Sequence, residues 1–194
     1  LIEAMRLGGM EFVLTAHEGS ASFAADVMGR ITGTPGFCIA TLGPGATNLA
    51  TGVGSAYLDR SPMIAVTCNL NTSQLGRRIQ MWIDHHALFA PITKASYAVK
   101  HDNVAEIMKE AITLALTEPM GPVHIDLPED VVLAPAKGTV NTSFSVKHVQ
   151  NTASDADIKK AIDLLEKAQK PVAILGSSAM RMKDHTLLIK LSLI

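Results

Sequence analysis

Short runs of consecutive apolar residues alternate along this chain with longer stretches in which apolar residues recur every three or four positions. A continuous apolar run is typical of a parallel strand that is covered on both faces, and the wider spacing is typical of a helix. The alternation predicts an α/β fold with a doubly wound parallel sheet. The segments that predict strands are residues 11–16, 36–41, 63–68, 96–100, 123–127 and 171–175, and among them residues 63–68 form the continuous apolar run.

The stretches between these runs predict helices, and several carry signals for where a helix begins. Asn103 and Glu106 have capping-box spacing, and Ser154 precedes a helical pattern as an N-cap would. Gly52 and Gly54 lie inside a predicted helix, where a glycine costs roughly 1 kcal/mol, so we expect a close neighbour there. The predicted helices are residues 1–8, 21–32, 46–57, 103–115, 154–168 and 185–194, and a short helix is one interpretation of residues 80–91.

The composition changes after the first series of elements. Residues 135–153 are rich in Thr, Ser, Asn and Lys and have no hydrophobic period, which is typical of an interdomain linker. We therefore predict a first domain over residues 1–134 and the start of a second α/β domain over residues 154–194. The second segment is too short to bury its own core, so we expect the chain to be part of a larger protein.

Composition and charge narrow the classes of protein that fit. The 194 residues are 47% hydrophobic and 18% charged, with a net charge of −1 and no basic run, so we expect neither nucleic acid nor a membrane as a partner. No apolar stretch reaches the ~18 residues of a membrane span, and no signal peptide is recognisable. Cys38 and Cys68 lie in apolar runs, as buried free thiols of a cytoplasmic protein would.

Candidate chemistry centres on residues 41–48, Thr-Leu-Gly-Pro-Gly-Ala-Thr-Asn, where a glycine turn joins a predicted strand to a predicted helix. Ligands can approach the backbone closely at such a turn. Glu18 also follows a predicted strand, so we expect it to lie near the turn at one sheet edge. By spacing alone, a structural turn and a dinucleotide site both stay open, although the dinucleotide fingerprint lacks its third glycine and Asp59 comes too early for its acid.

Several short motifs occur in a fixed order along residues 1 to about 133. They are His17-Glu18, Ala24-Ala25-Asp26, Gly29-Arg30, Gly33-Thr34-Pro35-Gly36, Gly43-Pro44-Gly45-Ala46-Thr47-Asn48, Ala56-x-x-Asp59-x-x-Pro62 and Gly121-Pro122-Val123-x-Ile125-Asp126-Leu127-Pro128. Together they resemble the pyrimidine-binding N-terminal domain of thiamine-diphosphate enzymes of the acetolactate synthase and pyruvate oxidase type. Residues 154–194 resemble the start of that family's central domain more loosely. The resemblance implies a decarboxylase or carboligase, a lyase or transferase that acts on a small 2-oxo acid.

The resemblance also implies roles for the residues around the turn. Glu18 matches the catalytic glutamate that bonds N1′ of the cofactor pyrimidine, where protonation favours the imino tautomer that takes the proton from the thiazolium carbon. A carboxyl in a largely apolar pocket is expected to have a raised pKa, so that it can share a proton near neutral pH. The implied cofactor-binding residues, which pack on or face the ring, are Thr41, Gly43, Pro44, Gly45 and Asn48.

Residues 79–88 depart from the family, in which a Phe-Gln pair in this region helps to form the substrate site. Only Gln80 corresponds to a member of that pair. His85 and His86 are similar to a histidine pair that relays protons in pyruvate decarboxylase-type relatives, and histidine titrates near neutral pH. These three residues are the candidate substrate residues. The alternative is that the histidines lie at a surface or interface on a short helix.

The resemblance also marks what this sequence lacks. The family holds Mg²⁺ and the diphosphate with a Gly-Asp-Gly and Asn-Asn motif in a C-terminal domain, and neither that motif nor a metal-ligand cluster occurs here. The family's first strand and helix are also missing. Relatives share the active site between subunits, which implies a homo-oligomer, a dimer or tetramer. We expect no turnover from this chain alone and weak thiamine diphosphate binding at best. A non-catalytic module that kept the fold remains an alternative, as does a dinucleotide-binding domain.

Overall fold

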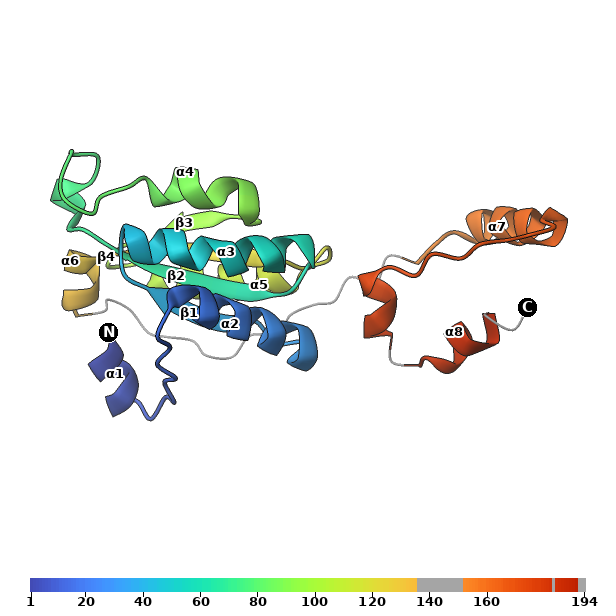
Figure 1. The fold of residues 1–194 in the computed structure, drawn as a ribbon, viewed down its shortest axis with the longest axis horizontal. Helices are drawn as coiled ribbons and strands as arrows, with labels where there is room; N and C mark the ends of the chain where they lie inside the picture. The colour runs from blue at the N-terminus through green and yellow to red at the C-terminus, as the bar shows by residue number, and fades with distance from the viewer. Residues whose placement is uncertain (136–151, 183, 192–194) are drawn as a thin grey trace. The chain divides into compact units, whose positions relative to one another are not determined.

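The computed structural model describes residues 1–135, 152–182 and 184–191, and the chain divides into two compact units, Leu1–His148 and Val149–Ile194. The predicted linker, residues 135–153, lies almost entirely outside the described residues, so the predicted domain limits stay a prediction. In chain order (Figure 1), the first unit contains α1 (Ile2–Leu7), α2 (Glu18–Thr32), β1 (Gly36–Ala40), α3 (Pro44–Leu58), β2 (Met63–Asn69), η1 (Thr72–Gln74), α4 (His85–Phe89), η2 (Ala90–Ile92), β3 (Ser96–Ala98), α5 (Val104–Leu116), β4 (Pro122–Pro128) and α6 (Glu129–Leu133).

The four described strands form one all-parallel sheet in the order β1-β2-β4-β3. Helices cover both faces of this sheet (Figure 1). Along β2, Met63 and Ala65 pack in the core formed with α2 and α3, whereas Ile64 and Val66 pack in the core formed with α5. This alternation explains why the strand is apolar at consecutive positions. The doubly wound parallel sheet predicted from the sequence is confirmed.

Gly52 and Gly54 of α3 differ in their surroundings. A Cβ added to Gly52 would lie 2.2 Å from Oγ of Ser22 and 2.8 Å from the backbone nitrogen of Phe23, both in α2. A Cβ added to Gly54 would meet only Ile92, at an ordinary contact distance of 3.8 Å. The close neighbour expected from the sequence is therefore present at Gly52, where it lets α2 and α3 approach each other, and is not required at Gly54.

We expect alanine at these two positions to change stability in opposite directions. Gly52→Ala should lower the free energy of unfolding by about 1–3 kcal/mol, because the new methyl group overpacks against α2. Gly54→Ala should raise it by about 0.5–1 kcal/mol, because alanine favours a helix where no neighbour interferes. Urea denaturation of both variants measures the difference, and equal destabilisation at both positions would contradict the packing described.

Two of the predicted strands are wrong. Residues 11–16 and 171–175 form no strand, and among the described elements no strand pairs with either segment. A strand needs a hydrogen-bonded neighbour, which an apolar pattern alone does not supply. Val13, Leu14, Val172 and Ile174 are each more than four-fifths exposed. Their apolar pattern therefore marks surface that the described residues do not cover.

The helix starts predicted at Asn103 and Ser154 are confirmed, but only Ser154 caps its helix with its side chain. The second unit contains α7 (Asp155–Lys167), η3 (Ser177–Arg181) and α8 (Thr186–Leu191). Ser154 caps α7 as predicted, because its Oγ accepts a 3.2 Å hydrogen bond from the amide of Asp157. The predicted capping of α5 is wrong, because Oδ1 of Asn103 accepts instead from the amide of Lys100 at 2.7 Å.

Within the described ranges, no helix is both long and apolar enough to cross a membrane.

Candidate functional site

Glu18 and the glycine turn meet where β1 ends, as expected, although the strand in residues 11–16 on which that expectation relied does not form. Glu18 is the first residue of α2, and its carboxylate accepts a 3.0 Å hydrogen bond from Nδ2 of Asn48 in α3. A Cβ added to Gly45 would lie 2.7 Å from Cγ2 of Thr41 and 3.5 Å from Oε1 of Glu18. The structure therefore brings Glu18, Thr41, Gly45 and Asn48 together around one small space.

Local sequence explains how these residues are held. His17 caps α2, because its Nδ1 accepts a 3.0 Å hydrogen bond from the amide of Gly19, and the negative charge of Glu18 then stands at the positive end of the helix dipole. Gly43 has a φ of 62°, a conformation that side chains other than glycine rarely adopt. Pro44 follows it at the first position of α3, where its missing N–H costs nothing.

The pKa of Glu18 lies below its usual value, so the predicted raised pKa is wrong for this chain. The main cause is the hydrogen bond from Asn48, supported by a bond from the backbone amide of Glu18 itself. Burial acts in the opposite direction but is weaker, and the neighbouring His17 adds a smaller lowering. Glu18 is half-buried, and its lowered pKa keeps it ionised at neutral pH.

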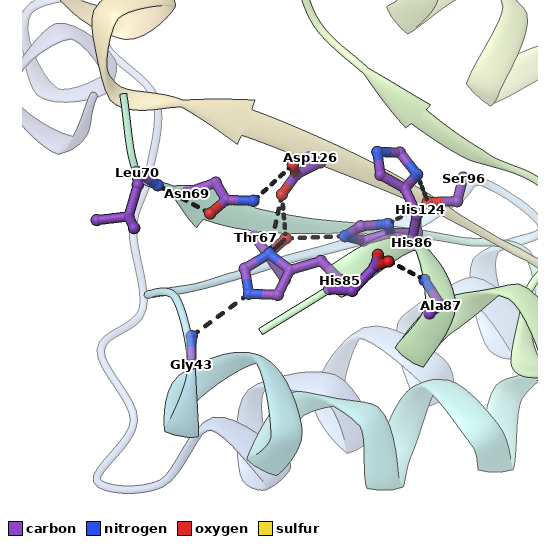
Figure 2. A network of polar contacts seen from close by, with 11 residues as sticks. Gly43, Thr67, Asn69, Leu70, His85, His86, Ala87, Ser96, His124 and Asp126 are labelled. Atoms are coloured by element: carbon purple, nitrogen blue, oxygen red, sulfur yellow. Dashed lines mark hydrogen bonds and ion pairs between the residues drawn. The ribbon is translucent and has the colours of Figure 1, made fainter. Parts of the chain in front are cut away.

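A group of buried polar side chains lies next to the turn (Figure 2). Thr67 of β2 stands opposite Asp126 of β4 in the sheet. Oγ1 of Thr67 lies 3.0 Å from Nδ1 of His85, 2.8 Å from Nε2 of His124 and 3.1 Å from Oδ1 of Asp126. None of these four residues is more than 2% exposed. We call Thr67, His85, His124 and Asp126 the buried polar cluster.

The buried polar cluster connects to its surroundings at three points (Figure 2). Nδ2 of Asn69 donates to Oδ2 of Asp126 at 2.8 Å. Oγ of Ser96 lies 2.6 Å from Nδ1 of His124 and 2.7 Å from Nδ1 of His86. The amide of Gly43 donates to Nε2 of His85 at 3.3 Å, so the cluster reaches the glycine turn itself.

Asp126 fixes the direction of the hydrogen bonds in the cluster. Burial alone would raise its pKa, but the bonds from His85 and Asn69 and the nearby histidines hold the pKa below its usual value, so Asp126 is an ionised carboxylate. An ionised carboxylate only accepts hydrogen bonds. Thr67 and His85 therefore both donate to Oδ1 of Asp126, at 3.1 and 2.9 Å.

The positions of the other protons in the cluster follow from the ionised state of Asp126. Because the Thr67 hydroxyl donates to the carboxylate, it must accept from Nε2–H of His124. Burial lowers the pKa of His124 to about 3, despite the opposing effect of Asp126, so the ring is neutral and its Nδ1 carries no proton. That Nδ1 then accepts from Ser96, whose oxygen accepts from Nδ1–H of His86. The hydrogen bonds run in one direction, from His86 to Asp126.

The three candidate substrate residues lie in different surroundings. Gln80 is exposed, His86 is half-buried against Ser96, and His85 is 1% exposed. Their role toward a substrate stays a prediction. Within the part of the chain that the structure describes, no group of three or more metal-ligating side chains is placed to hold a metal ion.

Sequence reasoning did not single out Thr67, His124 or Asp126. The signal that could have found them is a polar residue inside an apolar run, which occurs once in residues 63–67 and twice in residues 123–127. Polar side chains in a strand covered on both faces need partners within the core, so polar positions of this kind in a sequence indicate a buried network.

The fold and the site define an α/β domain in which an acid faces a glycine turn at the end of a parallel strand. Residues 1–88 match the family "Thiamine pyrophosphate enzyme, N-terminal TPP binding domain". This match confirms the resemblance stated above to the N-terminal domain of thiamine-diphosphate enzymes, over residues 1–88.

Acetolactate synthases are among the similar curated proteins. The chain is 38% identical over 178 residues to the probable acetolactate synthase large subunit of Methanocaldococcus jannaschii, an alignment that covers 87% of this chain and 29% of the relative. It is 37% identical over 195 residues to that of Methanococcus aeolicus, covering 97% and 33%. It is 37% identical over 175 residues to the acetolactate synthase isozyme 2 large subunit of Escherichia coli, covering 90% and 32%. The chain thus spans about a third of the length of the curated relatives it matches.

Proposed function

We propose that this chain is the N-terminal part of a thiamine-diphosphate-dependent decarboxylase or carboligase that acts on a 2-oxo acid, as an acetolactate synthase does. The observation that carries the proposal is the approach of the Glu18 carboxylate to Gly45 and Asn48. The names of the similar curated proteins support the reaction class. The complete enzyme is then a lyase or transferase with a small-molecule substrate.

The residues around the turn fit a flat heteroaromatic ring. At Gly45 a side chain would crowd the Thr41 methyl group and approach the Glu18 carboxylate, so the glycine keeps the surface beside these two residues low. When bound, thiamine diphosphate supplies a nucleophilic carbon that attacks the carbonyl of the 2-oxo acid. Glu18 would hold a proton at N1′ of the pyrimidine, Asn48 would orient the Glu18 carboxylate, and Gly43, Pro44, Gly45 and Thr41 would support the ring.

The ionised state of Glu18 in this chain is compatible with that role. A ligand that removes water from a half-buried carboxylate raises its pKa, because burial disfavours the charged form. Glu18 would then begin as the proton acceptor and hold the proton once water has left. The hydrogen bond from Asn48 keeps the carboxylate in place in both states.

We also propose that the rest of the cofactor site lies outside this chain. Mg²⁺ and the diphosphate would be held by a C-terminal domain of the complete enzyme, and the active site would be shared between subunits of a homo-oligomer. The chain alone would then bind thiamine diphosphate weakly and have no turnover. Experiments on cofactor binding therefore use the complete enzyme that carries this chain.

Gly45→Ala in the complete enzyme is expected to weaken thiamine diphosphate binding by roughly tenfold or more, a loss of about 1.4 kcal/mol. The exposed Thr41 side chain can turn away from the added methyl group, so the melting temperature should change little while the space for the ring is lost. Calorimetric titration with thiamine diphosphate and Mg²⁺ measures the affinity.

Gly54→Ala, on the same helix but in open surroundings, is the matched control and should bind the cofactor as the unchanged enzyme does. Unchanged affinity in Gly45→Ala would contradict the proposed ring site. Binding of a nicotinamide or flavin dinucleotide at residues 43–48, in place of thiamine diphosphate, would favour the dinucleotide alternative.

A further inference from the structure

We propose that His85 is a positioning residue that holds the glycine turn from inside the protein, and that Asp126 fixes the tautomer in which it does so. The evidence is the hydrogen bond from the Gly43 amide to Nε2 of His85 together with the bond from Nδ1 of His85 to Asp126 (Figure 2). His85 is 1% exposed and uses both ring nitrogens within the chain, so it is placed to hold the turn from inside.

Residues 81–85 contact the turn at two points. Besides His85, the carbonyl oxygen of Met81 lies where a Cβ of Gly43 would be, at 2.5 Å from that position. Met81 itself has a φ of 66°, which is uncommon for a residue with a side chain and costs of order 1–3 kcal/mol. A segment held in this conformation against Gly43 leaves little freedom for the turn to move.

The backbone of His85 is also held in place, because His85 is the first residue of the capped helix α4. Oδ1 of Asp84 caps α4 by accepting a 2.9 Å hydrogen bond from the amide of Ala87. This cap starts the helix at His85 and directs the His85 ring into the core, where it lies beside Thr67 and Asp126. The ring therefore joins the end of β4 to the turn that follows β1.

The tautomer of His85 follows from its two partners. The amide of Gly43 can only donate, so Nε2 of His85 must be without a proton. The carboxylate of Asp126 can only accept, so Nδ1 must carry the proton. Asp126 thus selects the form of His85 that accepts the Gly43 amide, just as a second group often sets which ring nitrogen of a histidine is protonated.

The consequence for the cofactor rests on the function proposed above. If the Gly43 turn supports a pyrimidine ring, a loosened Gly43 peptide would lower the affinity for that ring without changing the residues that face it. His85 would then act through Gly43 and Asp126, both named in the hydrogen bonds above, and not by touching the ring.

Two substitutions of His85 separate the hydrogen bond to Gly43 from the bond to Asp126. The amide group of His85→Gln reaches about as far as Nε2 and can still accept from Gly43, whereas the shorter amide group of His85→Asn stays near Asp126 and does not reach Gly43. Amide hydrogen exchange of Gly43, followed by NMR on the 194-residue chain, is expected to be at least about tenfold faster in His85→Asn. It should stay within a few-fold of the unchanged chain in His85→Gln.

The tautomer is measured on the unchanged chain, so the test does not depend on the variants folding. Correlation spectra of the ¹⁵N-labelled histidine rings should show the proton of His85 on Nδ1 and none on Nε2. A proton on Nε2, or equal Gly43 exchange in both variants, would overturn the proposal. Gly43 exchange that is fast only in His85→Asn would support it.

Cofactor affinity in the complete enzyme tests the link to function separately. Thiamine diphosphate with Mg²⁺ is expected to bind roughly tenfold more weakly to His85→Asn and close to normally to His85→Gln. Equal, normal affinity in both variants would overturn the effect of His85 on the ring site. Failure of the unchanged enzyme to bind thiamine diphosphate would overturn the proposed function and leave the NMR result for His85 standing.

Discussion

Glu18→Gln in the complete enzyme is expected to reduce kcat by about 10²–10⁴-fold, the range of a lost general acid–base group. Glutamine has nearly the same shape and its Oε1 can still accept the hydrogen bond from Asn48, so the fold around α2 should be kept. Its amide cannot hold an ionisable proton, so the step that needs one at the pyrimidine is lost. Affinity for thiamine diphosphate should stay within a few-fold of the unchanged enzyme. Steady-state kinetics and calorimetry measure the two quantities.

Glu106→Gln is the matched control, because Glu106 is also an acid in the first turn of a helix but is exposed on α5. It should leave kcat unchanged. Retained turnover in Glu18→Gln would rule out the proposed role of this carboxylate, whereas loss of both turnover and cofactor binding would assign it to binding.

The sequence was sufficient to predict the strands that are buried on both faces. The apolar run in residues 63–68 reflects two cores that the strand separates, and this is a property of the strand itself. The predicted strand in residues 11–16 failed because a strand also depends on a neighbour. The hydrophobic periodicity and composition of a segment indicate which side chains it can bury. They do not indicate whether a second strand lies beside it to pair with its backbone.

In the candidate site, too, the features that depend on contacts between distant segments could not be predicted from the sequence. Glu18 and the glycine turn do converge, but the expectation assumed a strand in residues 11–16 that does not form. Glu18 reaches the turn because α2, which it begins, packs against α3. The lowered pKa of Glu18 was not predicted, because it depends on one contact with Asn48, thirty positions along the chain. The buried polar cluster was also missed, because Thr67 and Asp126 become neighbours only through the register of β2 and β4.

Between pH 6.5 and pH 3 we expect the free energy of unfolding to fall steeply, with His124 as the largest single cause. Burial lowers the pKa of His124 to about 3 in the folded chain, from a usual value of 6.5. As the pH falls below 6.5, the unfolded chain therefore binds a proton that the folded chain does not, so stability falls with falling pH. Each pH unit is worth about 1.4 kcal/mol, which gives a loss of about 5 kcal/mol by pH 3.

The contributions of His124 and Asp126 to stability are lost in different pH ranges, so they can be measured separately. The pKa of Asp126 is lowered by folding, so its contribution to stability is present above its usual value of 3.8 and is lost only as the pH falls below that value. Denaturant titrations between pH 6.5 and 4.5 therefore report on histidines and not on this carboxylate.

His124→Gln should flatten the pH dependence across that range, because glutamine does not titrate. It should also be less stable at pH 7, because it loses the stacking of the imidazole on Phe89, whose ring lies 4.2 Å away. His101→Gln, in the loop before α5 and outside the buried polar cluster, should keep the full slope. An unchanged slope in His124→Gln would show that the ring takes up its proton in the folded chain. The Thr67 hydroxyl would then still accept a hydrogen bond from Nε2–H of His124, but Ser96 could no longer donate to Nδ1, and the one-directional order of the cluster would be wrong.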